Sequence, residues 1–179
     1  MDRIVSNNSP IKLYYFVGPQ KIREMHSNES IGKRIGSIRD MENWFTLTKQ
    51  RPNNDNEIVV TFVINKEEQL VISDRRTEHF ACAGGQPVLS AGEMSFSPKS
   101  STNEIEVVQV SNLSTGYCPE PASWTHVRNA LDKINIKHPD DFTSKFIFRQ
   151  CQNCGQVSVV KNTNYKCEVC DSDLPMGSK

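Results

Sequence analysis

The chain has 179 residues, of which 36% are hydrophobic and 23% charged, and its 21 basic and 21 acidic residues give no net charge. This composition excludes an intrinsically disordered chain and is typical of one globular core with a small appended module. The zero net charge argues against a chain-wide basic surface for nucleic acid, although it leaves a local basic patch open. No apolar run approaches the roughly 20 residues of a membrane span. Because the first residues lack the pattern of a signal peptide, we expect a soluble cytoplasmic protein.

The first fifty residues predict a tail, a strand and a helix. Residues 1–10 are polar and predict a flexible tail, whereas the β-branched and aromatic residues of 11–17 predict a strand. Ser37 is a suitable N-cap for a helix over 38–49, whose apolar residues have helical spacing. The isoleucines of 31–38 have helical spacing too, but two glycines weaken a helix there, so this stretch is ambiguous.

The middle of the chain predicts four strands. Residues 57–64 and 70–74 form one expected hairpin, because each run is short, apolar and β-branched. Residues 86–96 and 104–111 form a second expected pair, joined by the exposed loop 97–103.

A helix and a last strand follow. Pro121 can open a helix that continues to Ile134, with a buried stripe at offsets of three and four residues, and 145–150 reads as a strand. Helices at both ends of a strand-rich centre predict an α+β domain over 11–144. The side chains expected to be largely buried are Trp44, Phe62, Val63, Met94, Val107, Trp124 and Leu131.

Four of the six cysteines predict a metal site. Cys151 and Cys154 form one CxxC pair, and Cys167 and Cys170 form another twelve residues later. Each CxxC turn directs two thiolates at one point, so the spacing predicts a structural zinc ribbon over 145–175 followed by a short tail at 176–179. Thiolates favour Zn²⁺, with Fe²⁺ as the lesser alternative, and unrelated cysteines or disulfides remain the competing interpretation. The ribbon has too small a basic surplus to predict contact with phosphates.

Three features in and just before the second strand pair are candidates for function. Gly84 and Gly85 fit either a tight turn with positive φ or the close approach of a cofactor or ligand to bare backbone. Glu93 shares a predicted strand face with Leu89 and Ala91, which is unusual for a carboxylate. It is either a solvent-exposed edge residue, a buried partner of Arg75 or Arg76, or a catalytic acid–base. His79 is either a base or an ordinary surface histidine.

The loop over 111–121 is the expected main functional surface. It is longer than most connections, its prolines stiffen it, and it carries Ser114 and Tyr117 as further catalytic candidates. The competing interpretation is that Tyr117 fills the core and its hydroxyl caps a strand end. Cys82 and Cys118 are expected to be buried apolar fillers, although Cys118 with His79 would suit a Cys–His pair.

Residues 14–121 contain, in order, FVGPQKIRE, TFVINKEEQLVISDRR, ACAGGQPVLSAGEMSF and SNLSTGYCP. This series resembles the core of plant calmodulin-binding IQM-type proteins, and it implies a shared domain without implying a reaction. Ser114, Tyr117 and Pro119 match the family's loop, whereas Gly116 stands where the family has histidine, and His79 is out of register with the family's histidines. Because no IQ helix is visible, the resemblance does not imply calmodulin binding.

Two functional hypotheses remain. The favoured one is a zinc-binding adaptor module whose central loops and ribbon contact a protein or nucleic-acid partner, with no membrane involved. The alternative is an enzyme, such as a transferase acting on a nucleotide-like substrate, that uses a cleft near Gly84 and Tyr117. The adaptor is favoured because the sequence shows no nucleophile–base pair, open metal site or cofactor loop.

Overall fold

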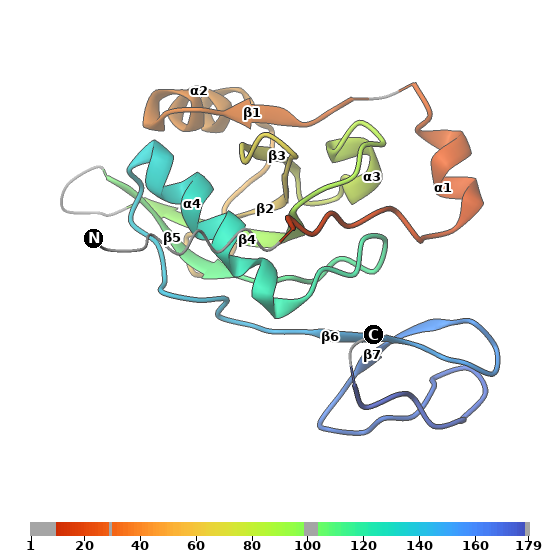
Figure 1. Ribbon diagram of the computed structural model, residues 1–179. Helices are drawn as coiled ribbons and strands as arrows, with labels where there is room; N and C mark the ends of the chain where they lie inside the picture. Colours follow the sequence, from red (N-terminus) through yellow and green to blue (C-terminus); the bar gives the residue numbers. More distant parts are fainter. Residues whose placement is uncertain (1–9, 29, 99–103, 178–179) are drawn as a thin grey trace, which may run out of the picture.

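The computed structural model describes residues 10–28, 30–98 and 104–177, and it has the predicted α+β fold (Figure 1). Residues 1–9 of the predicted tail 1–10, residues 178–179 of the predicted tail 176–179 and residues 99–103 of the predicted loop 97–103 lie outside the described residues. Within the described part, no helix is long and apolar enough to cross a membrane. The elements are α1 (Gln20–Met25), β1 (Lys33–Ile35), α2 (Ile38–Leu47), β2 (Ile58–Ile64), β3 (Leu70–Asp74), α3 (His79–Cys82), β4 (Ser90–Pro98), β5 (Ile105–Val110), the 3-10 helix η1 (Pro121–Ser123), α4 (Trp124–Ile134), β6 (Ile147–Gln150) and β7 (Val157–Val160).

Five antiparallel strands form the central sheet in the order β1-β3-β2-β4-β5. Both predicted strand pairs are confirmed, since β2 pairs with β3 and β4 pairs with β5. The register of β4 and β5 shifts by one residue between Ser95 and Phe96, which is a β-bulge. The two hairpins meet where β2 pairs with β4, so the sheet is one continuous layer.

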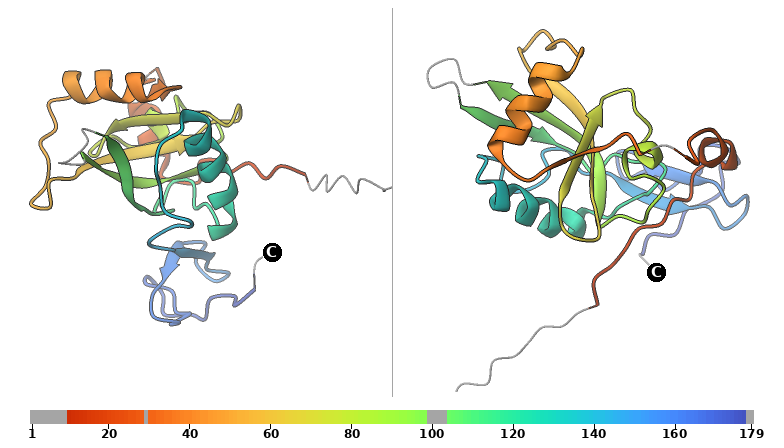
Figure 2. Two further views of the ribbon diagram at one scale, coloured as in Figure 1. Left: turned by 90° about the vertical axis from the view of Figure 1, so that its left-hand side faces the viewer. Right: turned by 90° about the horizontal axis from the view of Figure 1, so that it is seen from above.

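The two faces of the sheet are covered by different elements. Because side chains alternate along a strand, Phe62 and Met94 face the larger core, which α2 and α4 complete. On the opposite face, Val63 and Ala91 pack with α3 and with the segment 14–17 in a second, smaller core. In the left view of Figure 2, α2 (orange) lies above the sheet and α4 (teal) at its side, with the blue ribbon below the main domain.

The two long helices form as the sequence predicts. The Ser37 hydroxyl accepts the amide hydrogen of Asp40 at 3.1 Å and caps α2. The apolar stripe of α4 is buried, and Asn135 ends this helix in the left-handed conformation with φ 57°. Of the seven side chains expected in the core, only Trp44 is half-buried, because it lies at the rim of the larger core beside Phe45.

Non-local contacts correct one local prediction, decide one ambiguous stretch and add one element that was not predicted. Residues 11–17 do not form a strand, because within this segment only Tyr14 forms a β-bridge, an isolated one to Val88 with two hydrogen bonds of 2.8 and 3.0 Å. The ambiguous 31–38 stretch contains the edge strand β1, and a side chain at Gly32 would collide with the carbonyl of Cys82. The single-turn helix α3 is too short for its apolar spacing to be recognised in the sequence.

The C-terminal residues form a separate small hairpin, shown in blue beside the main domain in Figure 1. Strand β6 pairs antiparallel with β7, and the turns that carry the four cysteines surround this hairpin. The hairpin thus agrees with the predicted ribbon in its strand, turn and cysteine order.

Candidate metal centre and the groove beside it

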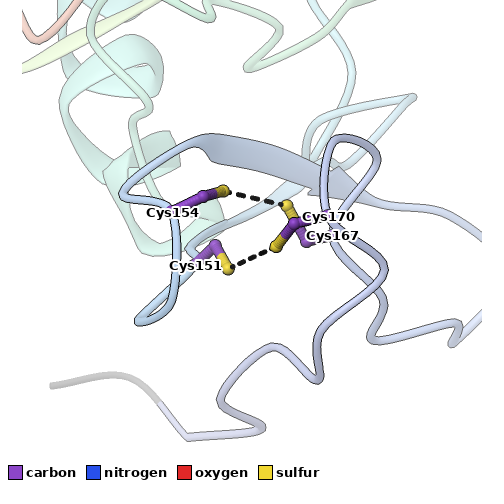
Figure 3. A group of neighbouring side chains, drawn as sticks. All are labelled: Cys151, Cys154, Cys167 and Cys170. Atoms are coloured by element: carbon purple, nitrogen blue, oxygen red, sulfur yellow. Dashed lines mark hydrogen bonds between the residues drawn. The ribbon is translucent and has the colours of Figure 1, made fainter.

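The four cysteines of the two CxxC pairs come together at one point (Figure 3). All four sulfur atoms lie within 4.8 Å of one another, and both Cys151–Cys170 and Cys154–Cys167 are separated by 3.6 Å. Such distances exclude disulfides, whose S–S bond is about 2.0 Å. The cluster can therefore hold a metal ion, whereas Cys82 and Cys118 are outside it.

Two turns with the same hydrogen bonds build this centre. In the first, the amide of Gly155 donates to the Cys151 carbonyl at 2.9 Å, and the Cys151 amide donates to the Gln156 carbonyl at 2.8 Å. In the second, the amide of Asp171 donates to the Cys167 carbonyl at 3.0 Å, and the Cys167 amide donates to Ser172 at 2.9 Å. Each CxxC pair therefore lies in the same type of turn, which points both of its thiols at the centre.

A residue with positive φ follows each CxxC pair. These residues are Gly155 with φ 75° and Asp171 with φ 58°. Glycine adopts this conformation without strain and aspartate tolerates it better than most residues do. Because the turn requires positive φ at this position, Gly155 has a structural role that the cysteine spacing alone does not predict.

Hydrogen-bond donors surround two of the sulfurs. The amides of Cys170 and Val169 lower the pKa of the Cys167 thiol. The Ser172 hydroxyl, 3.3 Å away, and the Asn153 amide lower the pKa of Cys170 to about 5. These donors favour the thiolate, which is the form that binds metal ions.

Cys154 differs from these two. The Gln156 amide acts to lower its pKa, but desolvation and the three neighbouring sulfurs outweigh that effect and raise the pKa to about 12. Adjacent thiolates repel one another, so a bound cation is needed for all four to ionise together.

The ribbon has little apolar core of its own. Among the described residues, its buried apolar cluster consists of Cys151, Cys167 and Leu174, against which Val160, Tyr165 and Cys170 pack. So small a cluster does not offset the conformational entropy of some thirty ordered residues. The free energy of metal binding can supply the stability that this small apolar cluster does not provide.

Asn112 joins the central loop to the ribbon, a role that the sequence analysis missed. Its side chain is fully buried, and its amide nitrogen donates to the carbonyls of Pro119 and Phe146, each at 2.8 Å. Its side-chain oxygen accepts the amide hydrogen of Phe146 at 2.7 Å. The loop is thus held in one shape and attached to the residue immediately before β6.

A groove of about 590 Å³ lies between this loop and the ribbon. Tyr117, Cys118 and Pro121 line one side, and the four residues of β6 line the other. The N-terminal segment adds Tyr15, whose side chain is 65% exposed. The predicted loop and the predicted ribbon therefore contribute to the same surface feature.

Tyr117 and Ser114 lie inside the loop and are buried. The Tyr117 hydroxyl donates to the Gln86 carbonyl at 2.8 Å, its ring packs edge-on against Phe16, and burial raises its pKa. The Ser114 hydroxyl accepts the amide hydrogen of Tyr117 at 3.3 Å. These contacts agree with the interpretation in which Tyr117 fills the core.

Gly84 and Gly85 have φ values of 60° and 74° and end α3, which agrees with the tight-turn interpretation. His79, at the start of this helix, lies 3.0 Å through Nε2 from the carbonyl oxygen of Gly92. Burial lowers the pKa of His79, so the neutral ring is favoured, and the neutral ring donates this hydrogen bond.

Glu93 forms an ion pair with Arg75, with 3.3 Å between Oε1 and Nε. Of the two residues predicted to share its strand face, Ala91 does and Leu89 does not, because Leu89 precedes β4 and packs in the opposite core. It is also in an interior strand of the sheet and not at an edge.

The four catalytic candidates Glu93, His79, Ser114 and Tyr117 therefore bond to separate partners, apart from the link between Ser114 and Tyr117. Cys118 is half-buried and not fully buried, because its left-handed backbone at the loop exit turns it toward the groove. Its thiol donates to the Thr115 carbonyl at 3.2 Å.

Comparison with models of protein families, with curated proteins and with solved structures found no match for this chain.

Proposed function

We propose that this protein is a zinc-dependent binding module, in which the ribbon and the 111–121 loop together bind an extended segment of a partner protein. The single observation that carries the proposal is the groove that these two parts line jointly. Zinc stabilises one wall of this groove and the main domain forms the other.

Zinc suits the cysteine cluster best. A tetrahedral ion with Zn–S bonds of about 2.3 Å places its sulfur ligands about 3.8 Å apart. Two of the sulfur pairs are 3.6 Å apart and all lie within 4.8 Å, so a small adjustment gives this geometry. Four thiolates select Zn²⁺ over hard cations, with Fe²⁺ as the lesser alternative. Since protein ligands fill all four positions, the ion has a structural role and activates no water.

The groove has the character of a peptide site. Its walls are rich in aromatic and aliphatic side chains, including Tyr15, Pro121 and Phe148. Val17 lies at the same place and is 57% exposed, so apolar surface is open to a partner. Exposed apolar surface rimmed by polar groups is typical of protein interaction sites.

Strand β6 offers backbone groups to the same partner. It pairs with β7 on one side, and within the described residues no strand pairs with its other side. All four residues of β6 line the groove although their side chains alternate in direction, so the groove runs along the edge of the strand. An extended peptide can add to such an edge as a third strand.

The charges in the groove favour a protein partner over nucleic acid. The groove is lined by Glu120, which pairs with the neighbouring Lys12 at 2.8 Å, and by Arg149, which donates to the carbonyls of Pro175 and Phe148. These cations are already engaged, which leaves little positive charge for a phosphate backbone. Calmodulin is not implied as the partner.

The alternative function, an enzyme acting on a nucleotide-like substrate between Gly84 and Tyr117, has less support. The Tyr117 hydroxyl is bonded to a backbone carbonyl, and burial raises its pKa. It is therefore a poor proton donor or acceptor for a substrate.

The test is a selection of peptides from a displayed random library on the zinc-loaded protein. We expect peptides with apolar residues that bind in the groove, and replacement of the exposed Tyr15 by aspartate should weaken them roughly tenfold. The matched control is Leu47→Asp on α2, because Leu47 is 81% exposed and does not line the groove. Chelation of zinc should abolish binding. Peptides that bind Y15D and the unchanged protein equally, or a selection that enriches none, would contradict the proposal.

A further inference from the structure

The sheet face that carries the smaller core changes from apolar to polar along its length. Val63 pairs with Ala91 at the apolar end, where the core covers both. The next pairs on the same face are Thr61 with Glu93 and then Val59 with Ser95. A buried sheet face has no need of a carboxylate at its centre, so the position of Glu93 requires another explanation.

Two neighbouring hollows lie over this polar end. The larger has a volume of about 780 Å³ and the smaller about 270 Å³, and they share Asn53, Glu57, Val59 and Arg75. Glu93 lines the smaller hollow beside this shared wall. Together they are in the size range of small-molecule sites. We call the two together the polar hollow.

One end of the polar hollow is rich in positive charge, although the chain as a whole is neutral. Four cations line the larger part, against the two carboxylates of Glu57 and Asp74. Lys49, Arg51 and Arg76 make no ion pair within the described residues. Arg75 uses only Nε for its ion pair with Glu93. The cationic end therefore retains guanidinium groups for an anion, and their planar geometry matches phosphate oxygens.

The backbone that carries two of these arginines is held rigidly. Thr61 donates to the carbonyls of Arg75 and Thr77, at 3.1 and 3.2 Å. The amide of Arg75 donates to Gln50 Oε1 at 2.9 Å, and the amide of Arg76 donates to Asp74 Oδ1 at 3.0 Å. A fixed turn loses little entropy on binding a ligand, which is a feature of prepared binding sites.

The other end of the polar hollow suits the rest of a nucleotide. Glu57, Glu93 and Gln109 line the middle and can hydrogen-bond sugar hydroxyls. Beyond them, Leu113 and half-buried Phe146 provide an apolar surface on which a planar base can stack. We infer that the polar hollow binds a nucleoside phosphate, with its phosphates at Arg51, Arg75 and Arg76 and its base toward Phe146. This site is separate from the peptide groove.

A nucleotide explains these features better than a nucleic-acid strand does. A single strand needs successive aromatic platforms, and among the residues that the structure describes Phe146 is the one aromatic side chain that lines either hollow. An acidic peptide would use the cations but not the adjoining carboxylates, which would repel it.

Isothermal titration calorimetry with ADP, UDP, pyrophosphate and adenosine tests this inference on the full, zinc-loaded chain. We expect a nucleoside diphosphate to bind roughly tenfold or more tightly than pyrophosphate or adenosine. The double substitution R51A/R76A should weaken that binding roughly tenfold or more, because it removes two charge-assisted contacts. Neither side chain makes a contact that the fold needs, so the variant is expected to fold normally.

The matched control is R39A/R128A. These arginines are exposed on α2 and α4, which cover the opposite face of the sheet, and their loss should leave binding unchanged. Equal binding of pyrophosphate and nucleotide would overturn the nucleotide in favour of a phosphate-only site. Tighter binding of a thymidine oligonucleotide than of either nucleotide would overturn it in favour of nucleic acid. An absence of nucleotide binding at about 1 mM, or binding that R51A/R76A does not weaken, would overturn the site itself.

Discussion

Replacement of Asn112 by alanine is expected to loosen the attachment of the ribbon to the main domain and to lower the stability of both. The side chain is fully buried and makes three hydrogen bonds of 2.7 to 2.8 Å, all to backbone groups. Each buried bond contributes about 1 kcal/mol net, so the loss should be about 3 kcal/mol. For a chain of this length, that corresponds to a decrease in Tm of roughly 6 to 12 °C.

Differential scanning calorimetry measures this change, and hydrogen exchange locates it. In N112A the amide of Phe146 loses its acceptor and should exchange faster. The control is N53A, since the Asn53 side chain also bonds to backbone groups, accepting two amide hydrogens, but lies on the exposed surface, where water replaces the lost bonds. A Tm decrease in N112A no larger than that in N53A, with the exchange at Phe146 unchanged, would refute the role assigned to Asn112.

Three further predictions concern single residues. Asp171→Gly should stabilise the ribbon by about 0.5 to 1 kcal/mol because φ is 58° at that position, whereas Gly155→Ala should destabilise it. Thermal melts in which both substitutions change Tm in the same direction would contradict the shared turn geometry. Tyr117→Phe should cost about 1 kcal/mol through the lost bond to Gln86 and leave peptide binding intact; lost binding with an unchanged melt would show instead that the hydroxyl contacts the partner. The pKa of His79 is lowered in the folded state, so the unfolded chain binds more protons near and below the ordinary value of about 6.5. The contribution of His79 is therefore complete above that pH and lost as the pH falls below it; denaturant titrations of His79→Gln should show a flatter pH dependence, and an identical slope would contradict the buried neutral ring.

Local sequence signals predicted those elements whose stabilising contacts are close in the chain. The cap of α2 by Ser37, the stripe of α4 and the two CxxC turns each depend on residues within a few positions of one another. Each of these motifs also has few alternative structures, so its pattern is specific.

The parts that could not be predicted depend on distant partners. Tyr14 lies in a segment with the composition of a strand, but its β-bridge depends on Val88, which is distant in the sequence. Asn112 reads as an ordinary turn residue, and its role follows only when Phe146 lies beside it. The odd position of Glu93 was visible in the sequence, whereas its ion pair with Arg75 and the hollow around it arise from the pairing of β2 with β4.

The most direct test of the central claim is the zinc content of freshly reduced protein, measured by elemental analysis together with native mass spectrometry. One zinc ion per chain is predicted for the unchanged protein and for C82S/C118S, because neither of those thiols belongs to the cluster. Substitution of Cys167 and Cys170 by serine should remove the ion and unfold the ribbon. Protein that contains no metal when freshly reduced, or that loses it equally when Cys82 is replaced, would contradict the account.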